Sequence, residues 1–356
     1  MMSDSLSWSK KSVEERSRLL MKVADIIEDN IDGFAEIDSK DHGQPISIAK
    51  FVDLNMALLM TIIRSHIQND PVTALDYVVR SAIGVVALIV PWNLPLYLLT
   101  TKLVPALAVG NTVVVKPSEL TSVSAWLLFN CFIDAGFPSG VVNLVMGCDN
   151  EVGVALARHS GVSVISFTGN TSAGRKIAQI CAETNKKISL EMSAKNAAIV
   201  FESCDIQKAV PHIIRSCFLN QGEMCHCTSR IFVQQTIFER FIEEFVKITS
   251  KLKVGDPRRD VHLGALISKD HYEKALSYIE MASKQSRVLL GSDQLTQEDQ
   301  EQEGYFIKPT IIIEVDDHNL LMQDEIFAPV VCVSPFVDNQ LLLNFILALY
   351  GVTAGW

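Results

Sequence analysis

The sequence lacks an excess of positive charge. Its 356 residues include 31 Lys and Arg against 41 Asp and Glu, which gives a formal net charge of −10. Phosphate backbones and anionic membrane surfaces attract chains that carry surplus positive charge. The composition therefore argues against nucleic acid and against a membrane as partners.

Long apolar runs are also missing. The two longest, residues 83–90 and 341–350, fall well short of the roughly 20 residues that a membrane-spanning helix needs. The first eleven residues contain no apolar stretch of the kind that forms the core of a signal peptide. We therefore expect a cytoplasmic protein.

Glycine and proline, at 18 and 12 residues, are too scarce for a protein built mainly of linkers. Hydrophobic residues make up 48% and charged residues 20%, a balance typical of a folded chain. Eight cysteines stand at irregular spacing, which argues against a small disulfide framework and indicates reduced thiols in an intracellular compartment. A chain of this length can bury a sizeable core, and two domains are favoured over one.

The first seventy residues have a helical pattern. Ser12, followed three residues later by Glu15, forms a capping-box pattern ahead of an apolar-periodic run. The pair Asp32-Gly33 predicts the end of that helix. A second helix is expected over about 45–68.

From residue 77 onward, short β-branched runs alternate with helical patterns. Gly110, Gly136 and Gly161 follow three of the helices, at positions that need left-handed caps. The strands are apolar on both faces, as in a buried parallel sheet. This pattern predicts an α/β fold with a doubly wound, Rossmann-like domain, which binds a nucleotide at the carboxyl ends of its strands. Strands are expected at 84–90, 112–116, 140–146, 162–168 and 196–201, and helices at about 95–109, 119–135, 150–159 and 172–184.

A second α/β section begins near residue 192, so we assign 1–191 to a helical region plus the dinucleotide-binding domain and 192–356 to a second domain. Its first helix carries an apolar stripe, and Pro211 is expected to kink that helix or delay its start. Helices are expected at about 206–219, 236–252 and 269–284, and strands at 230–234, 309–315 and 329–333.

One cysteine stands where a nucleophile is often presented. Cys225 follows an amphipathic helix and a break at Gly222, and it precedes a strand. A buried cysteine that behaves as a small hydrophobe is an alternative. A metal site is another, with ligands drawn from Cys217, Cys225, Cys227, His226 and His212, although the C-x-C spacing lacks the usual C-x2-C knuckle.

Six motifs in order carry a resemblance to a known family. They are PWNLP (91–95), KPSE (116–119), FTGNTSAG (167–174), LEMSAKN (190–196), FLNQGEMCHCTSR (218–230) and DEIFAPV (324–330). Together they resemble the signatures of the aldehyde dehydrogenase superfamily. The branch that the chain resembles most is the 2-aminomuconic semialdehyde dehydrogenase-like one.

The resemblance implies an NAD-dependent oxidation of an aldehyde to a carboxylic acid. Cys225 is then the nucleophile, which forms a thiohemiacetal and, after hydride transfer, a thioester. Asn93 supplies an oxyanion donor together with the Cys225 backbone N–H. Glu191 is the base for deacylation, a role that a partly buried carboxylate with a pKa near neutrality fills well.

The same resemblance implies a cofactor site. Lys116 and Glu119 would hold the adenosine ribose, and because a carboxylate there repels a ribose 2′-phosphate, NAD is favoured over NADP. The loop 169–174 opens a helix whose N-terminus can receive a pyrophosphate. The full expected set is Trp92, Lys116, Ser118, Glu119, Gly169, Asn170, Gly174, Glu325 and Phe327. The family is homo-oligomeric, and no metal is expected.

The chain also departs from the family pattern. Ser193-Ala194 replaces a Gly-Gly pair after the catalytic glutamate, where glycine gives the backbone freedom beside the cofactor. By this resemblance the chain is expected to be truncated at both ends, with the catalytic domain incomplete and the segment that pairs subunits absent. A catalytically impaired relative that retains nucleotide binding, or that acts as an interaction partner, is the alternative.

Overall fold

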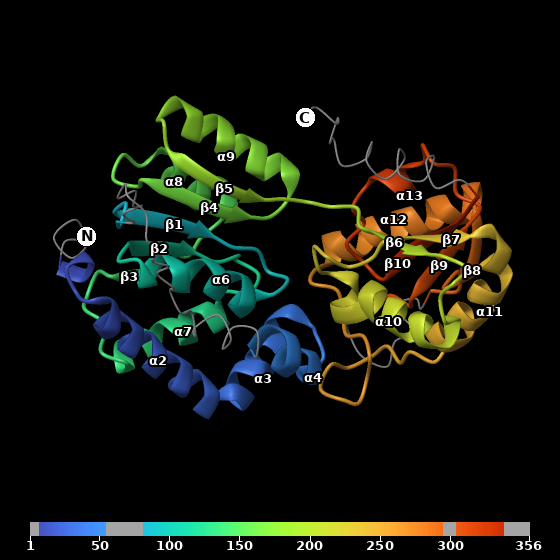
Figure 1. Ribbon diagram of the computed structural model, residues 1–356, viewed down its shortest axis with the longest axis horizontal. Helices are drawn as coiled ribbons and strands as arrows, with labels where there is room; N and C mark the ends of the chain where they lie inside the picture. Colours follow the sequence, from blue (N-terminus) through green and yellow to red (C-terminus); the bar gives the residue numbers. More distant parts are fainter. Residues whose placement is uncertain (1–6, 55–80, 295–303, 338–356) are drawn as a thin grey trace, which may run out of the picture. The chain divides into compact units, whose positions relative to one another are not determined.

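The computed structural model describes residues 7–54, 81–294 and 304–337. The chain divides into two compact units (Figure 1). Unit 1 consists of Met1–Asp41 and Ala49–Met192, and unit 2 of His42–Ile48 and Ser193–Trp356. Both are α/β, so the predicted fold class is confirmed.

Unit 1 is built on a five-stranded parallel sheet with the strand order β3-β2-β1-β4-β5. Every residue of β1 and β2 is buried, as the apolar sequences of these strands predicted. The fifth strand was not predicted, because it lies at the sheet edge and mixes exposed polar residues with apolar ones. The strands are β1 Val85–Ile89, β2 Thr112–Lys116, β3 Val142–Leu144, β4 Val164–Thr168 and β5 Lys187–Glu191.

Helices cover both faces of this sheet (Figure 1). On one face, α8 and α9 bury an apolar cluster against β1 and β4. On the other, α6 packs on β1 and β2, α7 packs on β3, and α2 packs on α6 and α7. This is the doubly wound arrangement that the alternating pattern predicted. The helices are α2 Val13–Asp29, α3 Ile31–His42, α6 Pro95–Ala108, α7 Val123–Asp134, α8 Val154–Arg158 and α9 Thr171–Glu183.

The predicted N-terminal signals are confirmed in part. The capping box between Ser12 and Glu15 is formed in both directions. The predicted stop at Asp32-Gly33 is wrong, because α2 ends at Asp29 and both residues lie inside α3. The break falls instead at Asn30, whose side chain donates a hydrogen bond to the Ile26 carbonyl over 2.8 Å.

The predicted left-handed caps are also confirmed in part. Gly110 and Gly136 adopt φ values of 93° and 87° after α6 and α7. Gly161 does not adopt a positive φ. Its amide donates a hydrogen bond to His159 Nδ1 over 3.0 Å instead.

Unit 2 contains a second five-stranded sheet, with the order β6-β7-β10-β9-β8. Its strands are parallel except for β8, which pairs antiparallel with β9. The strands predicted at 230–234, 309–315 and 329–333 are confirmed. The strand predicted at 196–201 with those of the doubly wound pattern belongs to this sheet instead, because it pairs with β7. The edge strand β8 was not predicted. The strands are β6 Ala197–Val200, β7 Arg230–Gln234, β8 Arg287–Leu290, β9 Thr310–Ile313 and β10 Val330–Phe336.

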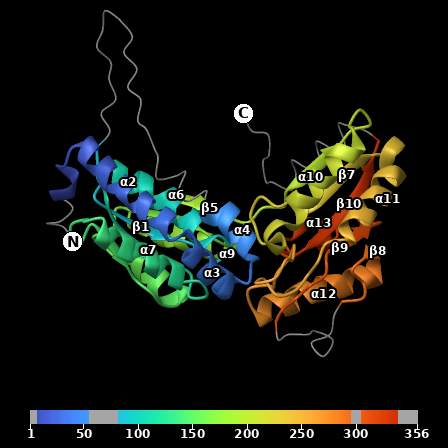
Figure 2. The same cartoon turned by 90° about the horizontal axis from the view of Figure 1, so that it is seen from below.

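Two apolar clusters fill unit 2, one on each face of its sheet (Figure 2). One lies under α10 and α11, and the other lies under α12 and α13. The apolar stripe of α10 is buried as predicted, but Pro211 does not delay its start, because Asp205 caps the helix at Ile206. The helices are α10 Ile206–Phe218, α11 Phe238–Thr249, α12 Lys269–Gln285 and α13 Leu320–Gln323.

Part of the sequence prediction falls outside the described residues. The helix expected over 45–68 is represented by a short helix, α4 Ile46–Ile48, and a π-helical turn, Ala49–Leu54. Its remainder and the apolar run 341–350 lie outside the described residues. All eight cysteines are free of disulfides. Within the described ranges, no helix is both long and apolar enough to cross a membrane.

Candidate active site

The carboxyl end of β2 carries a buried lysine and its partner. Lys116, the last residue of the strand, is fully buried, and its Nζ lies 3.1 Å from Glu119 Oε2. Such a charge is tolerated in the interior only when it is paired. Ser118, also buried, accepts a hydrogen bond from the Leu120 amide over 3.3 Å. The two predicted ribose-binding residues therefore lie together as one donor and one acceptor.

The N-terminus of α9 follows β4 at the same edge of the sheet. Asn170 caps this helix, because its Oδ1 accepts hydrogen bonds from the Ala173 amide over 2.8 Å and from Ser172 Oγ over 2.7 Å. The loop 169–174 thus opens a helix, as predicted, and places the positive end of a helix dipole at the sheet edge. At Gly174 a Cβ would lie 2.6 Å from Met192 Sδ, so a side chain there would require the Met192 side chain to move.

Glu191 ends β5, beside the last residue of β4. Its Oε2 accepts hydrogen bonds from Thr168 Oγ1 over 2.6 Å and from Lys102 Nζ over 3.1 Å. Partial burial favours the neutral acid, but the Thr168 hydroxyl and the Lys102 ammonium outweigh burial and hold the pKa of Glu191 below its usual range. In this arrangement Glu191 is an ionised carboxylate, not a base with the pKa near neutrality that the sequence analysis called for.

Trp92 and Asn93 lie between the end of β1 and the start of α6 at Pro95. Asn93 is buried, and Trp92 is half-buried. Because the strands are parallel, the carboxyl ends of β1, β2, β4 and β5 meet at one edge of the sheet. The structure therefore brings together all the predicted site residues of unit 1.

In unit 2, Cys225 lies in a loop that we call the thiol loop, residues 219–229, between α10 and β7. After Leu219, three consecutive residues of the loop have positive φ: Asn220 at 54°, Gln221 at 57° and Gly222 at 75°. Asn196 Nδ2 donates to the Cys225 carbonyl over 2.6 Å and to the Cys227 carbonyl over 3.2 Å. The loop is thus held at the thiol residue itself and two residues after it.

The two neighbouring cysteines differ from Cys225 in exposure. Cys225 is half-buried, and its Sγ lies 3.8 Å from His226 Nδ1. Cys227 is buried, and burial raises the pKa of its thiol to about 12. Burial likewise raises the pKa of the Cys217 thiol. In the part of the chain that the structure describes, no group of three or more His, Cys, Asp and Glu side chains could hold a metal ion.

Cys225 shares a pocket with the other predicted residues of unit 2. The pocket is lined by the thiol loop and by 325–328, so Cys225, Glu325 and Phe327 come together in it. Ala194, which follows the exposed Ser193, donates its amide to Glu325 Oε1 over 3.3 Å. Ala194, the second of the two residues that replace the expected Gly-Gly pair, therefore contacts the predicted cofactor-binding glutamate.

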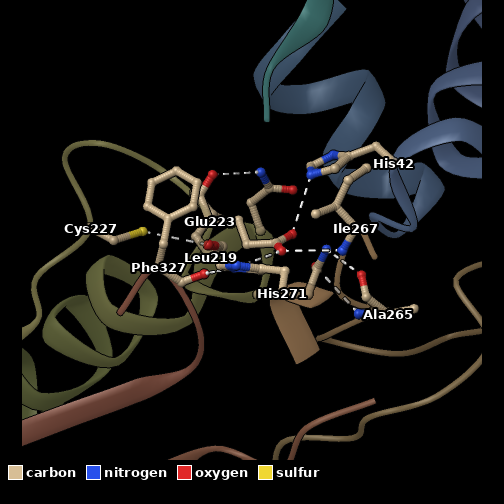
Figure 3. A network of polar contacts seen from close by, with 11 residues as sticks. His42, Leu219, Glu223, Cys227, Ala265, Ile267, His271 and Phe327 are labelled. Atoms are coloured by element: carbon tan, nitrogen blue, oxygen red, sulfur yellow. Dashed lines mark hydrogen bonds and ion pairs between the residues drawn. The ribbon is translucent and has the colours of Figure 1, made fainter. Parts of the chain in front are cut away.

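Three residues that the sequence analysis did not single out contact predicted ones, and a fourth, Glu223, lies in the thiol loop and contacts one of those three, His271. Lys102 and Thr168 hold Glu191, and Glu223 and His271 lie within the network behind the thiol loop (Figure 3). A sequence signal existed for Lys102, which is the lone charge in the apolar helix α6. It also existed for Glu223, an acid inside the thiol loop.

Comparisons with known proteins show which family the chain resembles in sequence and fold. Residues 3–345 match the model of the aldehyde dehydrogenase family. The chain is 46% identical over 347 residues to the 2-aminomuconic semialdehyde dehydrogenase of Homo sapiens, covering 94% of this chain and 71% of that protein. Among solved structures, an aldehyde dehydrogenase from Burkholderia cenocepacia, described there as putative, matches with a TM-score of 0.90 at 35% identity, covering 98% and 73% of the two chains. The NAD+ complex of a Bacillus cereus aldehyde dehydrogenase matches with a TM-score of 0.88 at 32% identity, covering 95% and 70%.

Lys102→Met should raise the pKa of the Glu191 carboxyl. The substitution removes the ammonium that favours the carboxylate, while the partial burial that favours the neutral acid remains. Titration of carbon-13-labelled glutamate side chains by NMR measures this pKa. Lys176→Met, at an exposed position of α9, is the matched control and should leave it unchanged. A Glu191 pKa that is unaltered or lower in Lys102→Met would contradict the assigned pairing.

Proposed function

The chain belongs to the aldehyde dehydrogenase family, and on that premise we propose that it uses NAD to oxidise an aldehyde to a carboxylic acid through a thioester on Cys225. The observation that carries the proposal is the pocket that Cys225 shares with Glu325 and Phe327. Of the three cysteines that line it, Cys225 alone is not buried. A half-exposed thiol in a fixed loop is suited to attack a carbonyl carbon.

The first step is attack of the Cys225 thiolate on the aldehyde. The new C–S bond places a negative charge on the carbonyl oxygen. Donors for this oxyanion are the Asn93 side chain, buried at the end of β1, and the backbone N–H of Cys225. Loss of one such donor typically costs about 10²–10³ in rate.

The residues at the sheet edge of unit 1 fit a dinucleotide. Glu119 can accept hydrogen bonds from ribose hydroxyls while Lys116 donates, and the N-terminus of α9 can receive a pyrophosphate. Glu325 and Phe327 are the proposed contacts for the nicotinamide end. When bound, NAD supplies the acceptor for the hydride that leaves the thiohemiacetal. The NAD+ complex of the Bacillus cereus relative supports this cofactor class.

Hydrolysis of the thioester requires a base, and Glu191 is the proposed one. Its carboxylate is ionised and can accept a proton from water, although the hydrogen bonds from Thr168 and Lys102 lower its pKa and make it a weaker base. The name of the human relative, a semialdehyde dehydrogenase, supports a semialdehyde as the substrate class.

Replacing Cys225 by Ala should lower aldehyde-dependent NADH formation by roughly 10⁴-fold or more, as loss of a catalytic nucleophile does. Cys227→Ala is the matched control, because Cys227 is buried two residues away and its thiol stays protonated near neutral pH. It should retain most of the activity. Activity that survives in Cys225→Ala would refute the proposed nucleophile, and so would equal loss in a folded Cys227→Ala protein.

Glu119→Gln should narrow the preference for NAD over NADP by about tenfold, because a neutral amide does not repel a 2′-phosphate. The ratio of kcat/KM for the two cofactors measures this preference. Glu183→Gln, an exposed change at the end of α9, should leave the ratio as it is in the wild type. A wild-type protein that prefers NADP would contradict the role given to Glu119.

A further inference from the structure

We propose that α12 is a positioning helix for the residues 324–327, which we call the cofactor segment, and that His271 is its key positioning residue. The inference rests on the proposed function, in which Glu325 and Phe327 of this segment contact the nicotinamide end of the cofactor. All the residues involved lie in unit 2.

One face of α12 is bound along the cofactor segment. Three side chains spaced three and four residues apart project from the same face of a helix. Each of them forms a hydrogen bond to a different residue of the segment, so the segment is held at both ends and near its middle. The contacts are Tyr278 Oη to Asp324 Oδ2 over 2.7 Å, Lys274 Nζ to the Glu325 carbonyl over 3.1 Å, and His271 Nε2 to the Phe327 carbonyl over 2.7 Å.

The chemistry of the last contact defines the state of His271. A carbonyl oxygen can only accept, so Nε2 carries the hydrogen and donates it. Burial lowers the pKa of His271, which keeps the ring neutral at physiological pH. The histidine therefore acts as a fixed donor. Its ring also meets the Phe327 ring edge-on, with centroids 6.2 Å apart.

Phe327 needs such support because its backbone is strained. Its φ of 60° lies in the left-handed region, which a residue with a bulky side chain rarely adopts. Conformations of this kind persist only where the surroundings fix them. The His271 bond fixes the carbonyl of Phe327, and the next residue, Ala328, is packed against Gly222 of the thiol loop.

The residues that lead into α12 hold the thiol loop as well (Figure 3). Glu223 Oε1 accepts a hydrogen bond from the Ile267 amide over 3.3 Å and lies 3.6 Å from His271 Nε2. Glu223 Oε2 lies 3.3 Å from His42 Nε2. Gln221 adds two bonds of 3.3 Å, to the Gly264 amide and the Ala265 carbonyl.

The start of α12 is thus the common support of the thiol loop and the cofactor segment. Loss of the His271 donor would release the carbonyl of Phe327 but leave in place the bonds of Glu223 and Gln221, which hold the thiol loop to residues 264–267. Hydride transfer needs the thiol loop and the cofactor segment to be aligned with each other. Its rate should therefore fall more than the reactivity of the Cys225 thiol. Misplacement by about 1 Å can cost on the order of 10²-fold in such a step.

The test compares His271→Leu, which removes the donor, with His271→Gln, whose amide can replace Nε2–H. His212→Leu, at an exposed position of α10, is the matched control. Three quantities are measured: hydrogen exchange of the peptide covering 324–330 without cofactor, alkylation of Cys225 by iodoacetamide, and the first-turnover burst of NADH with an aldehyde.

In His271→Leu we expect exchange in 324–330 to rise about tenfold, as loss of one hydrogen bond allows, and the burst rate to fall about 10–100-fold. Alkylation of Cys225 in His271→Leu should stay within about twofold of the wild-type rate. In the control His212→Leu all three quantities should stay within the same range. His271→Gln should regain most of the burst.

Unchanged exchange in His271→Leu would overturn the positioning role. Raised exchange with an unchanged burst would overturn the link between this positioning role and hydride transfer. A fall in the Cys225 alkylation rate as large as the fall in the burst rate would overturn the link as well. A wild-type protein without any burst would instead refute the proposed function, and the exchange result would still test the positioning of the segment.

Discussion

The thiol loop depends on a contact that only glycine allows. At Gly222 the φ is 75°, and a Cβ would lie 2.5 Å from the Ala328 carbonyl oxygen and 3.1 Å from the Pro329 nitrogen. No side chain fits between two backbones this close. The approach places the thiol loop directly against the residues that follow Phe327. The pocket of Cys225 exists because these two irregular segments meet, each held in turn by the start of α12.

The sheet edge of unit 1 follows a different rule, which is that buried charges must be paired. Lys116 and Lys102 are both lysines with buried side chains, and each meets a carboxylate, Glu119 or Glu191, at 3.1 Å. The partners are more exposed than the lysines, so a charged group faces outward at the ends of β2 and β5. Parallel strands bring these ends together. Charge pairing therefore places two carboxylates, which accept hydrogen bonds, at this edge of the sheet. The parallel topology brings them to the same edge as the N-terminus of α9.

Much of this arrangement could be predicted from the sequence. The central strands are mostly apolar, and the residues of the site stand in motifs at their ends. The edge strand Lys187–Glu191 was missed because exposure of both faces removes the apolar pattern. The helix through Gly33 was missed because packing overrides a local breaker. The roles of Lys102 and His271 could not be predicted, because their partners lie 89 and 56 residues away, and one of those partners is a backbone carbonyl.

The proposed chemistry requires an acyl group on one cysteine. Glu191→Gln should slow hydrolysis and allow that group to accumulate. This variant can be mixed with an aldehyde, with and without NAD, quenched in acid and analysed by peptide mass spectrometry. The expected result is the mass of the acyl group on the peptide that contains Cys225, formed only when NAD is present and removed by hydroxylamine. An acyl group on another cysteine, or NADH formation without any adduct on Cys225, would contradict the thioester mechanism.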